Sequence, residues 1–298
     1  MLTGIHFLLT YTCLYQCDHC FLYCSPSAEG TFTFDDIAAI LDDGQQLGSV
    51  EWVYFEGGEP FLFYPLMLQG IRAARDAGFQ VGVVTNAYWA TSAADAEIWL
   101  KPLQELGVAD LSMSEDAYHN PDGGESSVQL ARQAAENLGI PADVICIEKP
   151  CEQPAESGEK GAPVVGGSTL FKGRAVDKLT EGLPRQPWDS FTECPHEDFQ
   201  NPGRVHIDPF GNVFICQGLS IGNVHQQPLS QLMQNYRVEN HPVCGPLHAG
   251  GPAELTRQYT VSHDNSYVDA CHLCFTVRKA LIDKFPQYLT PKHVYGIS

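Results

Sequence analysis

The sequence predicts an α/β protein in which helices cover a parallel sheet. Strand-like apolar runs alternate with amphipathic helical segments through the first half of the 298-residue chain, and the connections between them are short. This alternation is typical of parallel sheets, because each parallel strand needs a crossover before the next one. An apolar content of 44% can fill the core of one large domain with a small appendage.

The first elements can be placed from local signals. Residues 5–9 are an apolar run after which the cysteines begin, and they are expected to form the first strand. Thr33 with the two aspartates after it is typical of a helix start, and apolar residues at helical spacing continue to Leu47, just before a glycine. A second strand is expected at 51–55 and a second helix at about 65–77.

The same alternation continues along the chain. A third strand is expected at 81–84, and Ser92 begins a helix that stops before Gly107. A fourth strand is expected at 110–114. Alanines at helical spacing then indicate a fourth helix, and a fifth strand is expected at 143–147.

The second half of the chain has a different character. Residues 148–168 are rich in proline and glycine, which predicts a long irregular connection. Beyond Pro187, residues 204–208 and 212–216 flank a glycine turn and are typical of a β-hairpin. We therefore expect two domains. Their predicted ranges are 1–187 and 188–298.

Charge and hydropathy exclude several classes of protein. The 36 acidic and 17 basic residues give a formal charge of −19, which repels phosphate backbones and argues against a nucleic-acid partner. A cationic substrate would suit this charge, and a solvated acidic surface is the alternative explanation. No apolar run approaches eighteen residues, and the N-terminus lacks a secretion signal. We expect no membrane partner and a cytoplasmic location, where clustered cysteines usually bind metal.

The cysteines after the first strand suggest a metal site. Cys13, Cys17 and Cys20 are spaced CxxxCxxC, and three thiolates this close in sequence can bind three irons of a 4Fe-4S cluster. The fourth iron would then lack a nearby protein ligand and remain reactive. A zinc loop completed by Cys24 or His19 is the alternative.

Polar and glycine residues also follow the next strands. Because ligands bind at the carboxyl ends of parallel strands, we expect these residues to share one pocket with the cysteine loop. They are Gly57, Gly58, Glu59, Asn86, Ser112 and Ser114.

The cysteine motif and the run Phe55-Glu56-Gly57-Gly58-Glu59-Pro60 together resemble the radical S-adenosylmethionine (radical SAM) superfamily. The resemblance implies a partial (β/α)6 barrel. It also implies that Gly57, Gly58 and Glu59 bind the methionyl amine of S-adenosylmethionine (SAM), and that His19 contacts its adenosyl group.

The resemblance implies weaker assignments for four other residues. Asn86, Ser112 and Ser114 are candidates for the ribose and carboxylate of SAM, and the alternative is that they bond to backbone at the strand ends. Arg174 stands in a Gly-Arg-Ala run that recurs in relatives with an extra cluster domain. It could bind a carboxylate of cofactor or substrate, or form a surface salt bridge.

Four later cysteines can supply a second metal site. Cys194 precedes the predicted hairpin, Cys216 ends it, and Cys271 and Cys274 form a CxxC pair. Four thiolates can hold a closed cluster. By resemblance this is a twitch domain, a shortened SPASM domain, with an auxiliary 4Fe-4S cluster. A four-cysteine zinc site is the alternative, and Cys244 could replace one ligand.

The resemblance implies that one electron from an external reductant, such as flavodoxin or ferredoxin, cleaves SAM to a 5′-deoxyadenosyl radical that abstracts a substrate hydrogen atom. The nearest resemblance is to epipeptide epimerases, which act on ribosomally made peptides. In those enzymes a second cysteine follows the hairpin cysteine and returns a hydrogen atom, whereas this chain has Gln217. Cys244, Cys146 or Cys24 would have to supply the thiol, and without it oxidation or a crosslink is expected.

Three functions therefore stay open from the sequence. The first is a peptide-modifying radical SAM enzyme. The second is a small-molecule dehydrogenase acting on an aminocyclitol-like alcohol. The third is a metal-stabilised binding or electron-transfer protein without catalysis.

Overall fold

The computed structural model describes residues 1–119, 126–153 and 164–297. Its main helices are α1 (Phe34–Leu47), α2 (Tyr64–Asp76), α3 (Ala93–Glu105), α4 (Ser127–Leu138), α5 (Arg174–Lys178), α6 (Leu229–Asn235), α7 (Cys244–Tyr259) and α8 (Ala270–Ala280). Its strands are β1 (Gly4–Thr10), β2 (Trp52–Gly57), β3 (Gln80–Thr85), β4 (Asp110–Ser114), β5 (Ala142–Ile145), β6 (Glu152–Gln153), β7 (Val164–Val165), β8 (Gln186–Pro187), β9 (Arg204–Ile207), β10 (Asn212–Cys216), β11 (Leu219–Asn223) and β12 (Ser266–Tyr267).

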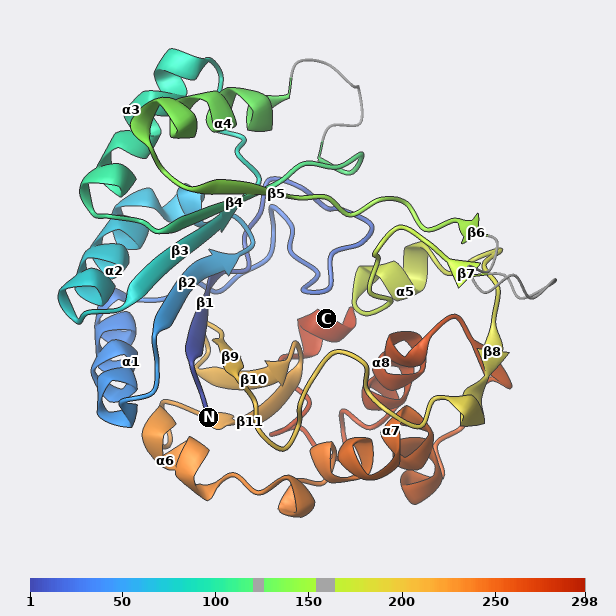
Figure 1. Cartoon of the computed structure of the whole chain (residues 1–298). Coiled ribbons are helices and arrows are strands. Elements are labelled where there is room, and N and C mark those ends of the chain that lie inside the picture. Colours follow the sequence, from blue (N-terminus) through green and yellow to red (C-terminus); the bar gives the residue numbers. More distant parts are fainter. Residues whose placement is uncertain (120–125, 154–163, 298) are drawn as a thin grey trace.

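One eight-stranded sheet forms the centre of the molecule, in the order β11-β10-β9-β1-β2-β3-β4-β5. Neighbouring strands from β9 to β5 are parallel. Strand β10 pairs antiparallel with β9, and β11 pairs antiparallel with β10. Figure 1 shows the sheet curving around a central space with α1 to α4 along its outer face. The predicted α/β class is confirmed, and over the described residues the sheet is open, with β5 and β11 at its edges.

The local signals explain these elements. Thr33 caps α1 by accepting a hydrogen bond from the Asp36 amide, and Gly48 ends the helix at φ 67°. In β1, Ile5 and Phe7 belong to the main apolar core, while His6 alternates to the opposite, inner face of the sheet. The outer face therefore supplies the core, and the inner face is free to carry polar groups.

The hairpin predicted for the second domain extends the sheet of the first. β9 pairs with β1 in parallel, with Gly4 opposite Arg204 and Phe7 opposite Ile207. The predicted boundary at residue 187 stays a prediction, but the sheet continues across it. A separate apolar core, which includes Leu247, Leu255, Leu273, Val277 and Tyr295, packs around α7 and α8.

Two predicted segments differ in detail. Residues 148–168 are not wholly irregular, because β6 and β7 pair with each other, and residues 154–163 lie outside the described part of the chain. The fifth strand ends at Ile145, two residues earlier than predicted. Within the described ranges, no helix is both long and apolar enough to cross a membrane.

Candidate functional site

A cavity of about 250 Å³ lies at the carboxyl ends of the parallel strands. It gathers the cysteine loop, the turn after β2 and the ends of β3 and β4, as the sequence predicts for a shared pocket. Among the predicted residues, those that line it are Cys13, Cys17, Cys20, His19, Gly57, Gly58, Asn86 and Ser114.

The turn after β2 passes directly beneath the cysteine loop. The amide of Gly58 donates to the Thr10 carbonyl at 2.7 Å, and the amide of Glu59 donates to the Thr12 carbonyl at 2.9 Å. A Cβ atom on Gly57 would lie 2.6 Å from the Thr10 oxygen, and one on Gly58 would lie 2.1 Å from the Thr12 oxygen. Both positions therefore require glycine, since backbone atoms fill the space that a side chain would need.

Glu59 is fully buried and is not part of the cavity lining, unlike its two glycine neighbours. Its carboxylate accepts hydrogen bonds from the Phe61 amide at 3.0 Å, the Thr85 hydroxyl at 2.8 Å and the Asn86 amide at 2.8 Å. Burial raises the pKa of Glu59 to about 7, against the lowering effect of these bonds. In this structure Glu59 ties the end of β3 to the turn after β2.

We expect Glu59→Gln to lower the free energy of unfolding by about 1–3 kcal/mol. One carboxylate oxygen would become an NH2 group, which cannot accept the hydrogen bond from the buried donor that it faces. Chemical unfolding followed by circular dichroism measures this loss. Glu51→Gln, at an exposed position, is the control and should leave stability unchanged. Equal stability of the Glu59 variant and wild type would contradict this structural role.

The remaining predicted cofactor residues divide into two groups. Asn86 lies at the cavity with its amide nitrogen 3.7 Å from the Cys13 sulfur, and His19 packs on the Tyr118 ring at 4.6 Å. Ser114 also faces the cavity. Ser112 instead donates to Asp110 at 3.1 Å and is not part of the lining.

Arg174 lies against the cysteine loop. Its guanidinium donates to the carbonyls of Cys17 at 2.7 Å and Cys24 at 2.8 Å, and its amide donates to the Cys20 carbonyl at 2.9 Å. No protein carboxylate lies within 4 Å of the guanidinium over the described ranges, so the alternative of a surface salt bridge is not observed, while binding of a cofactor or substrate carboxylate stays a prediction. The preceding Gly173 has φ 63° and leaves no room for a Cβ atom beside Phe21. The Gly-Arg pair thus holds the loop in place.

A second cavity brings together the four later cysteines, which come from the loop before β9, the end of β10 and the start of α8. They are Cys194, Cys216, Cys271 and Cys274. Lys172 and Arg278 line the same cavity and are 5% and 1% exposed. Four thiols with two buried cations fit an anionic metal-thiolate centre, because the cations offset its negative charge.

The other cysteines do not line either cavity, although Cys24 forms a hydrogen bond with Cys20. Cys244 is fully buried in the second apolar core. Cys24 is buried behind the first cysteine loop, and Cys146 and Cys151 are exposed. None of the four lines either cavity.

Sequence reasoning missed several polar groups. Glu56 lines the first cavity from β2, between two histidines, and Lys172 and Arg278 line the second. The alternation of β1 and β2 could have placed His6 and Glu56 on the inner face. No local signal marks Arg278, because a helix position alone does not reveal burial.

Comparison with known proteins agrees with the family resemblance of the cysteine loop and the glycine turn. Residues 7–138 match the model of the radical SAM superfamily. A Bacillus subtilis (strain 168) protein named for peptide biosynthesis, YydG, is 25% identical over 117 residues, which is 39% of this chain and 37% of the relative. The tungsten-containing aldehyde ferredoxin oxidoreductase cofactor-modifying protein of Pyrococcus furiosus is 33% identical over 101 residues, 34% of this chain and 27% of that protein.

The chain thus aligns with about a third of the length of these curated relatives. Among solved structures, BtrN in complex with AdoMet and 2-DOIA superposes with a TM-score of 0.52 at 16% identity, over 79% of this chain and 83% of BtrN. That likeness shows a shared fold. The cysteine loop and the glycine turn meet at one cavity inside residues 7–138, the part of the chain that matches the radical SAM superfamily.

Proposed function

We propose that this chain is an enzyme that binds a 4Fe-4S cluster through Cys13, Cys17 and Cys20 and cleaves SAM reductively. The observation that carries the proposal is that these three thiols and the Gly57-Gly58 turn line one cavity. Three thiols are the donor set of a cluster with one open iron. The turn also lacks side chains where its backbone meets the loop, which lets the two lie against each other at this cavity.

The chain's residues would position SAM beside the cluster. The backbone at Gly57 and Gly58 would receive the methionyl amine, and His19, which packs against the Tyr118 ring, would contact the adenosyl group. When bound, the cluster and SAM supply the 5′-deoxyadenosyl radical that takes a hydrogen atom from the substrate. Glu59 and Arg174 support the turn and the loop from outside the cavity.

For the second cavity we propose an auxiliary 4Fe-4S cluster on Cys194, Cys216, Cys271 and Cys274. Gln217 is 8% exposed, accepts a hydrogen bond from Lys172 at 2.9 Å and lies 3.5 Å from His206. An amide at this position cannot return a hydrogen atom as a thiol does. This favours oxidation or a crosslink over epimerisation.

The proposed substrate is a ribosomally made peptide, with support from the relative named for peptide biosynthesis. The second candidate is an alcohol of an aminocyclitol-like molecule. The amide of Gln217 agrees as well with this second candidate as with a peptide, because alcohol oxidation also needs no thiol donor. In both cases we propose an external one-electron reductant such as flavodoxin or ferredoxin, and a cytoplasmic location.

Anaerobic reconstitution followed by iron and sulfide counting tests this function. Wild type is expected to hold about eight irons, and a Cys13→Ala/Cys17→Ala/Cys20→Ala variant about four, with reductive SAM cleavage abolished. About four irons that vanish in the variant would refute the auxiliary cluster. SAM cleavage that survives in the variant would overturn the proposal as a whole.

A further inference from the structure

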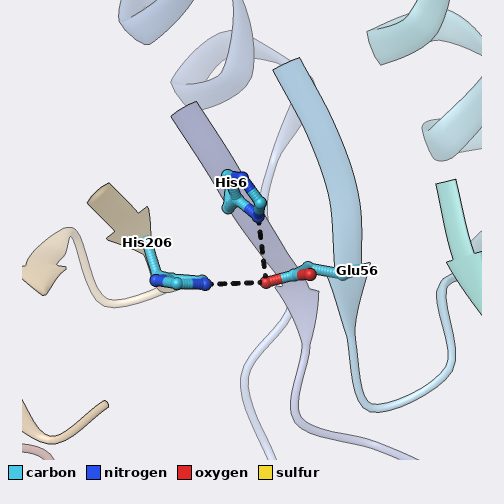
Figure 2. Close-up of side chains that lie close together, drawn as sticks. All are labelled: His6, Glu56 and His206. Carbon is cyan, nitrogen blue, oxygen red and sulfur yellow. Dashed lines mark ion pairs between the residues drawn. The ribbon is translucent and has the colours of Figure 1, made fainter. Parts of the chain in front are cut away.

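Three side chains of metal-ligating types meet on the inner face of the sheet, beside the first cavity. His6, Glu56 and His206 come from the adjacent strands β1, β2 and β9, and Figure 2 shows both imidazoles turned toward one carboxylate. His6 and His206 are direct partners in the pairing of β1 with β9. Because they stand on neighbouring strands of one sheet, the backbone fixes their spacing before any ligand binds.

The distances suit a shared cation. The Nε2 atom of His206 lies 3.1 Å from Oε1 of Glu56, and Nδ1 of His6 lies 3.5 Å from the same oxygen. One ligand atom from each residue falls within 4.8 Å of the others. Ligands bound about 2.1 Å from one ion in tetrahedral or octahedral geometry are themselves about 3.0–3.4 Å apart. The two nitrogen-to-carboxylate distances are close to this spacing, and the two imidazole nitrogens lie within 4.8 Å of each other.

The three groups are largely buried, and the Nδ1 atoms of both imidazoles have no hydrogen-bond partner among the described residues. Their side chains are 17%, 19% and 6% exposed for His6, Glu56 and His206. The Nδ1 atom of His6 faces the carboxylate, yet makes no hydrogen bond with any described residue. The Tyr54 ring stacks on His6 at 4.7 Å and holds the imidazole in this orientation.

We propose that His6, Glu56 and His206 bind one divalent transition-metal cation. Two imidazoles and one carboxylate with open positions are typical of Fe²⁺, and they also suit Mn²⁺ and Zn²⁺. Glu56 lines the first cavity, so the proposed metal site borders the space proposed for SAM and substrate. A substrate oxygen could complete the coordination there. The proposal does not depend on the proposed reaction.

Mn²⁺ is the best probe, because it prefers nitrogen and oxygen ligands to thiolates and so avoids the cysteine sites. Loss of the free Mn²⁺ electron paramagnetic resonance signal is followed during titration of the anaerobically reconstituted full chain. One Mn²⁺ per chain is expected. Glu56→Gln and His206→Gln should each weaken binding by at least about tenfold, since even loss of an outer partner of a ligand has that effect.

The matched control is Asp116→Asn. Asp116 belongs, with His19 and His119, to another cluster of side chains that could ligate a metal. This variant should bind Mn²⁺ like wild type. Equal iron content and circular dichroism of all variants establish that they fold, and Mn²⁺ should raise the melting temperature of wild type but not of Glu56→Gln. Absence of Mn²⁺ binding, binding unaffected by the Glu56 change, or loss only in the Asp116 variant would overturn the proposal.

Discussion

Replacing Gly58 with alanine is expected to reduce reductive SAM cleavage by at least about a hundredfold. The added Cβ would lie 2.1 Å from the Thr12 carbonyl oxygen and 3.0 Å from the Tyr11 carbonyl carbon, and both are backbone atoms that cannot rotate away. The loop that continues to Cys13 must therefore shift off the turn, which breaks the bonds from Gly58 and Glu59 to it. A displacement of about 1 Å in a catalytic site can cost a factor of about 100.

The rate of 5′-deoxyadenosine formation measures this effect in the reconstituted enzyme. Gly203→Ala is the matched control, because a Cβ at Gly203 meets no atom within 4 Å and its backbone does not have positive φ. The control should cleave SAM at the wild-type rate. A Gly58→Ala enzyme that is fully active would show that the cysteine loop does not need to rest on this turn.

Removal of the proposed auxiliary cluster from the second cavity is expected to destabilise the fold by about 3–5 kcal/mol. Lys172 lies 3.7 Å from the Cys216 sulfur, and Arg278 donates to the Gln217 carbonyl at 3.2 Å. Neither cation has a carboxylate within 4 Å among the residues that the structure describes. Without an anionic metal-thiolate centre both charges are buried and uncompensated, which has this order of cost.

A Cys271→Ser/Cys274→Ser variant, unfolded in guanidinium under anaerobic conditions, tests this expectation. Adding Arg278→Met to that variant should restore part of the lost stability, because it removes one buried charge. The same Arg278→Met change should destabilise the metal-loaded wild type. If it has the same effect in both backgrounds, the guanidinium does not compensate a metal centre.

Local signals were sufficient for most of the fold. The N-caps at Thr33 and Ser92 and the C-terminal glycine at Gly48 lie where the sequence predicts them, since capping depends on residues within one turn. The cavity at the strand ends could also be anticipated, because the carboxyl ends of parallel strands meet at one edge of a sheet.

Long-range pairing could not be anticipated in the same way. No local signal near residues 204–207 indicates that this strand pairs with β1, because pairing between strands far apart in sequence depends on the packing of the whole sheet. For the same reason, the sequence does not predict that His206 lies next to Glu56. The structure directs the Glu59 carboxylate to the backbone amides of Phe61 and Asn86, which no local signal indicates, and the role of Glu59 in SAM binding stays a prediction.

The position of β1 has a consequence for biosynthesis. β1 lies between β2 and β9, and Gly4 pairs with Arg204, so one edge of this apolar strand has no partner until β9 leaves the ribosome. At ordinary elongation rates that interval is about 10 to 40 seconds. An unpaired strand edge is a template for pairing with another chain. Yield of soluble protein should therefore depend on translation speed and on chaperones that cover this edge, more than on the equilibrium stability of the finished enzyme.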